Sequence, residues 1–294
     1  MVGDFREFLS TMKSKLSEFW TIYKTNTFGM IGLFMLMIFV LLAVLADFIA
    51  PYGEWEMLVG RPFEPPSIRH LFGTDELGRD VFSLVIYGTR VSLVIGITAA
   101  LLSTIIGGVV GLIAGYFGGI VDDVLMRITE AFLVVPAIVL MIILAAILGP
   151  SFINMIIVIA IVTWSPIARV IRSQVLVVKE LPYVEAAKAV GCSDFYIIFK
   201  HILPNVTPLL FANMILQVSN AILAEAALSF LGLGDPHHTS WGMILHYAHG
   251  SGALAAGYWW YVLPPGICIL LLVLAFVFIG YALDEIVNPR LRRR

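Results

Sequence analysis

The chain has 294 residues, of which 60% are hydrophobic and 13% charged, with a formal net charge of −2 and a mean hydropathy of +0.96. This composition lies far outside the range of soluble domains and predicts a polytopic membrane protein. It argues against nucleic acid as a partner, and the two cysteines, which lie far apart in the sequence, predict neither a disulfide framework nor a CxxC metal site.

Residues 1–27 are predicted to form a cytoplasmic amphipathic segment. Between positions 4 and 24 apolar side chains recur at spacings of three and four, and charged side chains lie between them. This pattern is typical of a helix lying in the membrane interface, where anchoring is favoured over a regulatory role. The apolar run that follows is too long for a signal peptide, so no cleavable signal is expected.

Six segments are apolar for long enough to cross about 30 Å of hydrocarbon, which takes roughly 20 helical residues. Backbone groups in lipid must be satisfied within each segment, so all six are predicted to be helices of an all-α membrane protein. The predicted spans are 28–46, 91–114, 131–148, 152–168, 207–230 and 263–283. Residues 28–90 then hold the first span and an extracytoplasmic loop, and residues 91–294 form a core of five spans.

The distribution of Lys and Arg predicts the orientation. With the N-terminus inside, 14 of the 18 basic residues fall on the inner side, and the other four lie in one outer loop, at Arg61, Arg69, Arg79 and Arg90. Because basic residues favour the cytoplasmic side, both termini are predicted to be cytoplasmic.

The inner loop at 170–206 carries helix start and stop signals. Pro182 begins a short helix at about 183–190, and Gly191 suits the left-handed residue that ends it. Ser193 is expected to cap a second helix at 194–201, which Pro204 should end. The small side chains of the first helix would let a partner approach its backbone; an amphipathic loop without a partner is the alternative.

Part of this loop resembles a known motif. The loop is similar to the cytoplasmic EAA loop of binding-protein-dependent ABC importer permeases. The residues that carry the similarity are Glu185-Ala186-Ala187, Gly191, His201 and Leu203-Pro204. The general pattern has Ile where this chain has His201, and His-Ile-Leu-Pro-Asn is typical of the dipeptide/oligopeptide branch. Stretches at 72–80, 87–93, 229–242 and 288–291 also resemble that branch.

The resemblance implies the type I importer permease fold and the second of two paired permeases in the cell membrane. The implied partners are a second homologous permease, two cytoplasmic ABC ATPases and an extracytoplasmic solute-binding protein. The chain has no phosphate-binding Gly-x-x-x-x-Gly-Lys motif, so we expect no cofactor here, and ATP and Mg²⁺ should bind to the ATPases. The predicted ATPase-docking residues are Tyr183, Glu185, Ala186, Ala187, Lys188, Gly191, His201, Leu203 and Pro204.

Two further groups of polar residues are candidates for function. Asp75, Arg79 and Asp80 in the outer loop either hold that loop together, which is favoured, or contact the receptor. In the fifth span the polar side chains either line the translocation path or bond to the partner permease, and both readings stay open. They are Asn213, Gln217, Asn220 and Glu225.

Several alternatives remain at the level of function. A proton-coupled transporter would use Glu225 or Asp47 as a relay, but neither paired repeats nor discontinuous helices are visible in the sequence. A metal site at the outer histidines 237, 238, 246 and 249 is not expected, because Asp235 is their single nearby carboxylate. Peptide is the favoured cargo, with oligosaccharides or nickel as alternatives.

Overall fold

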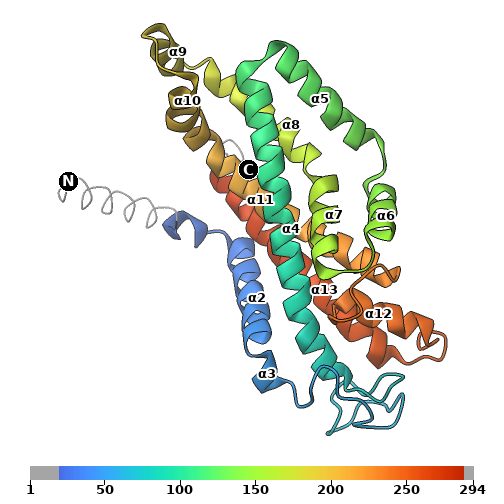
Figure 1. Cartoon of the computed structure of the whole chain (residues 1–294). Helices are drawn as coiled ribbons and strands as arrows, with labels where there is room; N and C mark the ends of the chain where they lie inside the picture. Colours follow the sequence, from blue (N-terminus) through green and yellow to red (C-terminus); the bar gives the residue numbers. More distant parts are fainter. Residues whose placement is uncertain (1–19, 288–294) are drawn as a thin grey trace.

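The computed structural model describes residues 20–287, and its regular elements in that range are helices, with one isolated antiparallel bridge between Thr74 and Asp80 (Figure 1). The elements of the first half are α2 (Thr27–Val44), α3 (Ala46–Ile49), α4 (Val81–Phe117), α5 (Gly119–Val134), α6 (Ala137–Leu148) and α7 (Phe152–Thr163). Those of the second half are α8 (Ser165–Lys179), α9 (Pro182–Ala189), α10 (Asp194–Ile197), the π-helix η1 (Ile198–Ile202), α11 (Leu203–Phe230), α12 (Trp241–Gly250) and α13 (Trp259–Val287).

The helices confirm a membrane-spanning chain. Four helical stretches in the described range are long and apolar enough to cross a bilayer, at 27–44, 81–117, 194–230 and 259–286. Two bent pairs, α5 with α6 and α7 with α8, bring the number to six if each pair crosses as one span. Most of the predicted N-terminal interfacial helix, residues 4–19, and the motif at 288–291 lie outside the described residues.

Several predicted spans differ from the observed helices, and the fourth, predicted at 152–168, is divided between α7 and α8 with a 44° bend. The second begins at Val81, ten residues before its predicted start, because Asp80 caps the helix by accepting from Ser83 N–H. The third, predicted at 131–148, is not one straight helix: Val135 is extended (ψ 131°) before Pro136, and α5 and α6 meet at 90°. The steric clash of a proline ring with the preceding residue disfavours helical backbone there, which explains this break.

Helix α4 lies at the centre of the fold. It packs against α7 and α8 on one side and α11 on another, while α13 lies between α11 and α2 (Figure 1). Three glycines of α4 face α8. An added Cβ would lie 2.5 Å from Trp164 O at Gly107, 2.5 Å from Ala168 O at Gly111, and 2.8 Å from Val175 Cβ at Gly115. This Gly-x-x-x-Gly-x-x-x-Gly series lets the two backbones approach closely, as small residues do between membrane helices.

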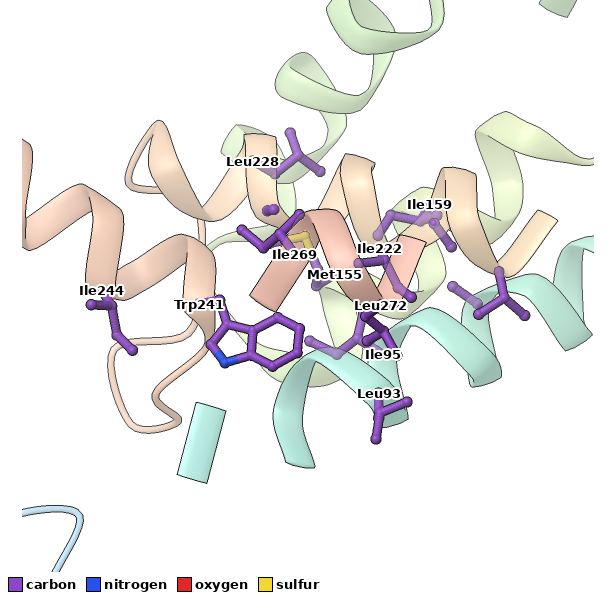
Figure 2. Close-up of a cluster of buried hydrophobic side chains, with 14 of the residues drawn as sticks. Leu93, Ile95, Met155, Ile159, Ile222, Leu228, Trp241, Ile244, Ile269 and Leu272 are labelled. Carbon is purple, nitrogen blue, oxygen red and sulfur yellow. The ribbon is translucent and has the colours of Figure 1, made fainter. Parts of the chain in front are cut away.

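The main hydrophobic core joins α4, α7, α11, α12 and α13. Figure 2 shows the side chains that meet there, among them Leu93, Ile95, Met155, Ile159, Ile222, Leu228, Trp241, Ile244, Ile269 and Leu272. The fully buried Trp241 donates from Nε1 to Val85 O at 2.9 Å, so its one polar atom is satisfied inside an apolar environment. This packing fixes α12 against the spans at the end of the molecule opposite α9 and α10 (Figure 1).

Candidate functional site

The short helix α9 begins and ends as its sequence predicts. Pro182 occupies its first turn, where the missing N–H costs nothing. At the other end Gly191 has φ +82° and donates to Lys188 O at 3.1 Å, while Cys192 N–H donates to Ala187 O at 3.1 Å. These two bonds form a Schellman motif, so the predicted left-handed stop at Gly191 is confirmed.

Most of α9 faces outward. Its buried residue is Val184, which packs into a second hydrophobic cluster with residues of α8, η1 and α11, among them Ile171, Val175 and Ile202. Glu185, Ala186, Lys188 and Ala189 are exposed, and no atom lies within 4 Å of the position that a Cβ at Gly191 would take. A helix held by one buried valine thus presents a nearly flat, small-residue surface with one acid and one base.

The segment after α9 corrects one expectation. Ser193 caps α10 by accepting from Tyr196 N–H at 3.3 Å, as predicted, but Pro204 does not end the helix. The chain passes through the π-helix η1 into α11, and 194–230 is one continuous 37-residue helix. The wider π turn accommodates a residue that can neither donate an N–H nor tolerate a tight preceding turn.

Side chains tie α9 and α10 to the spans. Asn205 Nδ2 donates to His201 O at 2.6 Å and to the Tyr183 hydroxyl at 3.1 Å, and the rings of Tyr183 and His201 lie 5.8 Å apart. The Tyr116 hydroxyl, at the end of α4, bonds to Asp194 Oδ1 at 2.6 Å. The loop is therefore a folded unit attached to α4, α8 and α11 together.

The structure gives Glu225 three hydroxyl partners within the chain. This side chain is fully buried within the chain, where the hydroxyl of Ser229 bonds to Oε1 at 2.7 Å and that of Ser92 to Oε2 at 3.3 Å. Ser240, the cap of α12, also bonds to the carboxylate. Within this chain Glu225 joins α4, α11 and α12, and these hydroxyl groups offset part of the cost of burying a carboxylate; a place on the path or at the partner permease stays a prediction.

The other polar residues of α11 have mixed environments. Asn213 is half-buried and donates to Leu209 O on its own helix at 2.8 Å. Gln217 is buried and its Nε2 has no hydrogen-bond partner among the described residues, whereas Asn220 is exposed and donates to Gln217 Oε1 at 3.4 Å. A path along this face stays a prediction.

Asp75, Arg79 and Asp80 hold the outer loop together from inside. Arg79 Nε donates to Asp75 Oδ2 at 2.5 Å, and the Asp75 carboxylate also accepts from Arg79 N–H at 2.8 Å. Burial disfavours the guanidinium charge, but the Asp75 carboxylate outweighs burial and raises the pKa of Arg79. Asp80 bonds to His70 Nδ1 at 2.9 Å besides capping α4. All three side chains are buried within the loop, where they make the internal contacts that the favoured reading predicts, and receptor contact stays an untested alternative.

The outer histidines have structural partners. His246 Nδ1 lies 2.9 Å from Phe230 O, and His238 Nδ1 lies 3.0 Å from Asp235 Oδ2. Burial alone would raise the pKa of Asp235, but N–H donation from His237 and Phe152 outweighs it and the pKa is lowered. Within residues 20–287 no three His, Cys, Asp or Glu side chains lie close enough to hold a metal ion.

One polar feature was missed from the sequence. A cleft of about 480 Å³ lies between α5 and α8, lined by Asp123, Arg127, Glu130, Arg169, Arg172 and Ser173 among others. Arg127 and Glu130 lie just before the predicted span at 131–148, where the sequence alone indicates boundary residues and no site. The signal that could have found the cleft is the spacing of three and four residues in 123, 127 and 130, facing a second set at 169, 172 and 173.

The bundle of apolar helices and the exposed, cap-defined loop α9–α10 define a membrane transport permease of the ABC importer class. Residues 107–293 match the model of the family described as binding-protein-dependent transport system inner membrane component, and residues 14–66 match that of the N-terminal TM domain of oligopeptide transport permease C. The chain belongs to the binding-protein-dependent transport system permease family, and it is a transport component rather than a catalytic subunit.

Similar proteins agree with this assignment. The chain is 38% identical to the dipeptide transport system permease protein DppC of Bacillus subtilis over 98% of its own length and 91% of that protein's. It is 36% identical to the oligopeptide transport system permease protein OppC of the same organism over 92% and 88%. The inward-facing MetNI methionine ABC transporter has the same fold, with a TM-score of 0.54 at 22% identity over 72% of this chain and 97% of that chain.

Proposed function

We propose that this chain is the second of two membrane subunits of an ATP-driven importer and forms half of the pathway for peptides delivered by a solute-binding protein. The observation that carries the proposal is the exposed surface of α9, which packs with residues of α8, η1 and α11 in one apolar cluster and bonds to α11 through Asn205, while the adjoining α10 bonds to α4 through Asp194. The relatives named for dipeptide and oligopeptide transport support peptide as the cargo. Oligosaccharides or nickel remain alternative cargoes.

In the proposed mechanism, two cytoplasmic ATPases bind ATP and Mg²⁺ and close on each other, and α9 follows the ATPase on which it docks. Because Val184 fixes α9 to the cluster beneath it and Asn205 bonds to Tyr183, that motion passes to α8 and α11. Rigid-body tilting of packed helices then opens the pathway to one side and closes it to the other. Glu185, Lys188 and Gly191 are the proposed centre of the docking surface.

The proposed orientation places α9 and both termini in the cytoplasm, supported by the 14 basic residues on that side. Labelling of intact cells with a membrane-impermeant maleimide tests it. A Ser251→Cys chain should react and a Lys188→Cys chain should not, and the reverse pattern contradicts the orientation.

Uptake by the reconstituted importer tests the function. The chain, its partner permease, the two ATPases and the binding protein are placed in vesicles, and uptake of a labelled dipeptide is followed. We expect uptake that requires ATP hydrolysis and the binding protein. Uptake driven by a proton gradient without ATP hydrolysis would reject the proposal, and ligand identification on the binding protein would decide between peptide, oligosaccharide and nickel.

A further inference from the structure

The polar cleft between α5 and α8 is lined by charged side chains in addition to the one that forms an ion pair between these two helices. Arg172 is committed to Asp122, with Nε and Nη2 each 2.5 Å from one carboxylate oxygen, and this bidentate pair joins α8 to α5. Asp123, Arg127, Glu130 and Arg169 line the same cleft. These four residues do not take part in the Arg172–Asp122 ion pair that joins α8 to α5.

These four residues are two acids and two bases without ion-pair partners. Among residues 20–287 none of Asp123, Arg127, Glu130 and Arg169 makes an ion pair within 4.0 Å, and all four are exposed. Their charges sum to zero, and both signs face one cavity. Such an arrangement complements a ligand that carries one positive and one negative group rather than a simple anion.

The cleft also extends far along the spans. Glu130 lies 11 residues after the start of α5, and Arg169 lies ten residues before the end of α8. At 1.5 Å per residue both are about 15 Å from the helix ends near α9. Since charged groups are costly wherever a helix faces lipid, these side chains should face water or protein, and the cleft provides that surface.

We propose that this cleft binds the charged termini of a short zwitterionic peptide on the inner part of the pathway. Arg127 and Arg169 would receive the carboxylate, since a guanidinium binds it bidentately, and Asp123 and Glu130 would receive the ammonium group. The volume of about 480 Å³ is within the range of small-ligand sites. The inference rests on the proposed importer function and places part of the pathway on α5 and α8 rather than on α11.

Thiol protection in the assembled importer tests the site directly. Ser173→Cys is introduced into a chain carrying Cys192→Ala and Cys268→Ala, and alkylation at position 173 is timed without ATP in phosphatidylcholine vesicles. We expect 10 mM L-alanyl-L-alanine to slow alkylation at least threefold and the N-acetylated, C-amidated dipeptide to have no effect. Adding Arg127→Gln and Arg169→Gln should abolish the protection. The control is a thiol introduced by Ser251→Cys on the opposite end, whose reactivity should not change.

Uptake provides the second measurement. At saturating loaded binding protein, the Arg127→Gln, Arg169→Gln importer should transport the dipeptide at least tenfold more slowly while its ATPase activity is retained; Arg61→Gln, the same change on an exposed outer residue, should have no such effect. Three results would overturn the inference. Alkylation could be equal with and without the dipeptide, the blocked dipeptide could protect equally well, or the protection could follow the phosphatidylethanolamine content of the vesicles instead. Absence of ATP-driven uptake by the unmodified importer would instead reject the proposed function.

Discussion

A side chain at Gly191 should impair coupling through backbone strain alone. Gly191 ends α9 at φ +82°, and no atom lies within 4 Å of the position of an added Cβ, so Gly191→Ala introduces no steric clash. An L-residue in the left-handed region costs about 1–2 kcal/mol. Because about 1.4 kcal/mol is a tenfold change in an equilibrium constant, the equilibrium constant for a correctly ended α9 should fall several-fold, and further for the β-branched Gly191→Val.

The fold offers a matched control at its other end. Gly252 ends α12 with the same two bonds, donating to His249 O while Ala253 N–H donates to Ala248 O, at φ +73° and again with no atom within 4 Å of an added Cβ. Gly252→Val therefore adds similar strain without touching α9.

The assay compares ATP-driven uptake and receptor-stimulated ATP hydrolysis in vesicles at matched protein content. We expect Gly191→Val to lose uptake several-fold and to lose receptor stimulation of ATP hydrolysis, with normal membrane insertion, while Gly252→Val stays within about twofold of the unmodified importer. Unchanged transport by Gly191→Val, or equal losses in the two variants, would refute the role assigned to the end of α9.

Three further outcomes follow from buried contacts. Gly111→Leu should lower the thermal unfolding midpoint in detergent by the equivalent of about 1–3 kcal/mol or more, because its Cβ collides with the α8 backbone, whereas Gly266→Ala, which meets nothing within 4 Å, should be neutral. Asp75→Asn should cost about 3–5 kcal/mol by leaving Arg79 buried without its carboxylate, also measured by thermal unfolding; no loss would contradict the importance of the pair. Because the pKa of Asp235 is lower in the folded chain, its carboxylate adds stability that is complete above the unfolded pKa of about 3.9 and is lost as the pH falls through the folded pKa. The unfolding midpoint should therefore depend less on pH in the acid range in Asp235→Asn than in the unmodified chain.

Local signals with a single outcome were predictable from the sequence. Pro182, Gly191 and Ser193 each favour one backbone geometry, and the short helix and its caps lie where these residues place them. Gly149 likewise separates α6 from α7 at φ +81°. At these positions the conformational preference of one residue is decisive, and tertiary contacts do not oppose it.

Other features depend on neighbours that a single sequence does not reveal. Pro204 permits either a helix end or a π turn, and the bonds of Asn205 accompany the second. Glu225 is costly in lipid wherever it lies, but its three serine partners come from α4, α11 and the start of α12. Arg127 reads as a boundary residue in isolation, and the cleft appears only when α8 folds back beside α5.

The π-helix η1 adds one residue to a turn, and that extra residue sets the angular position of everything on its far side. Each α-helical residue rotates the chain by about 100°, and a residue in the wider π turn rotates it less, so an ideal α-helix with the same number of residues would carry Asp194 and α10 roughly a quarter-turn away from Tyr116. Replacing the π turn at 198–202 by a regular α-helical turn, with every residue kept, would thus leave the composition and the membrane crossing unchanged while misaligning the attachment of the loop to α4. In this protein the count of residues, as much as their kind, determines which way the loop faces.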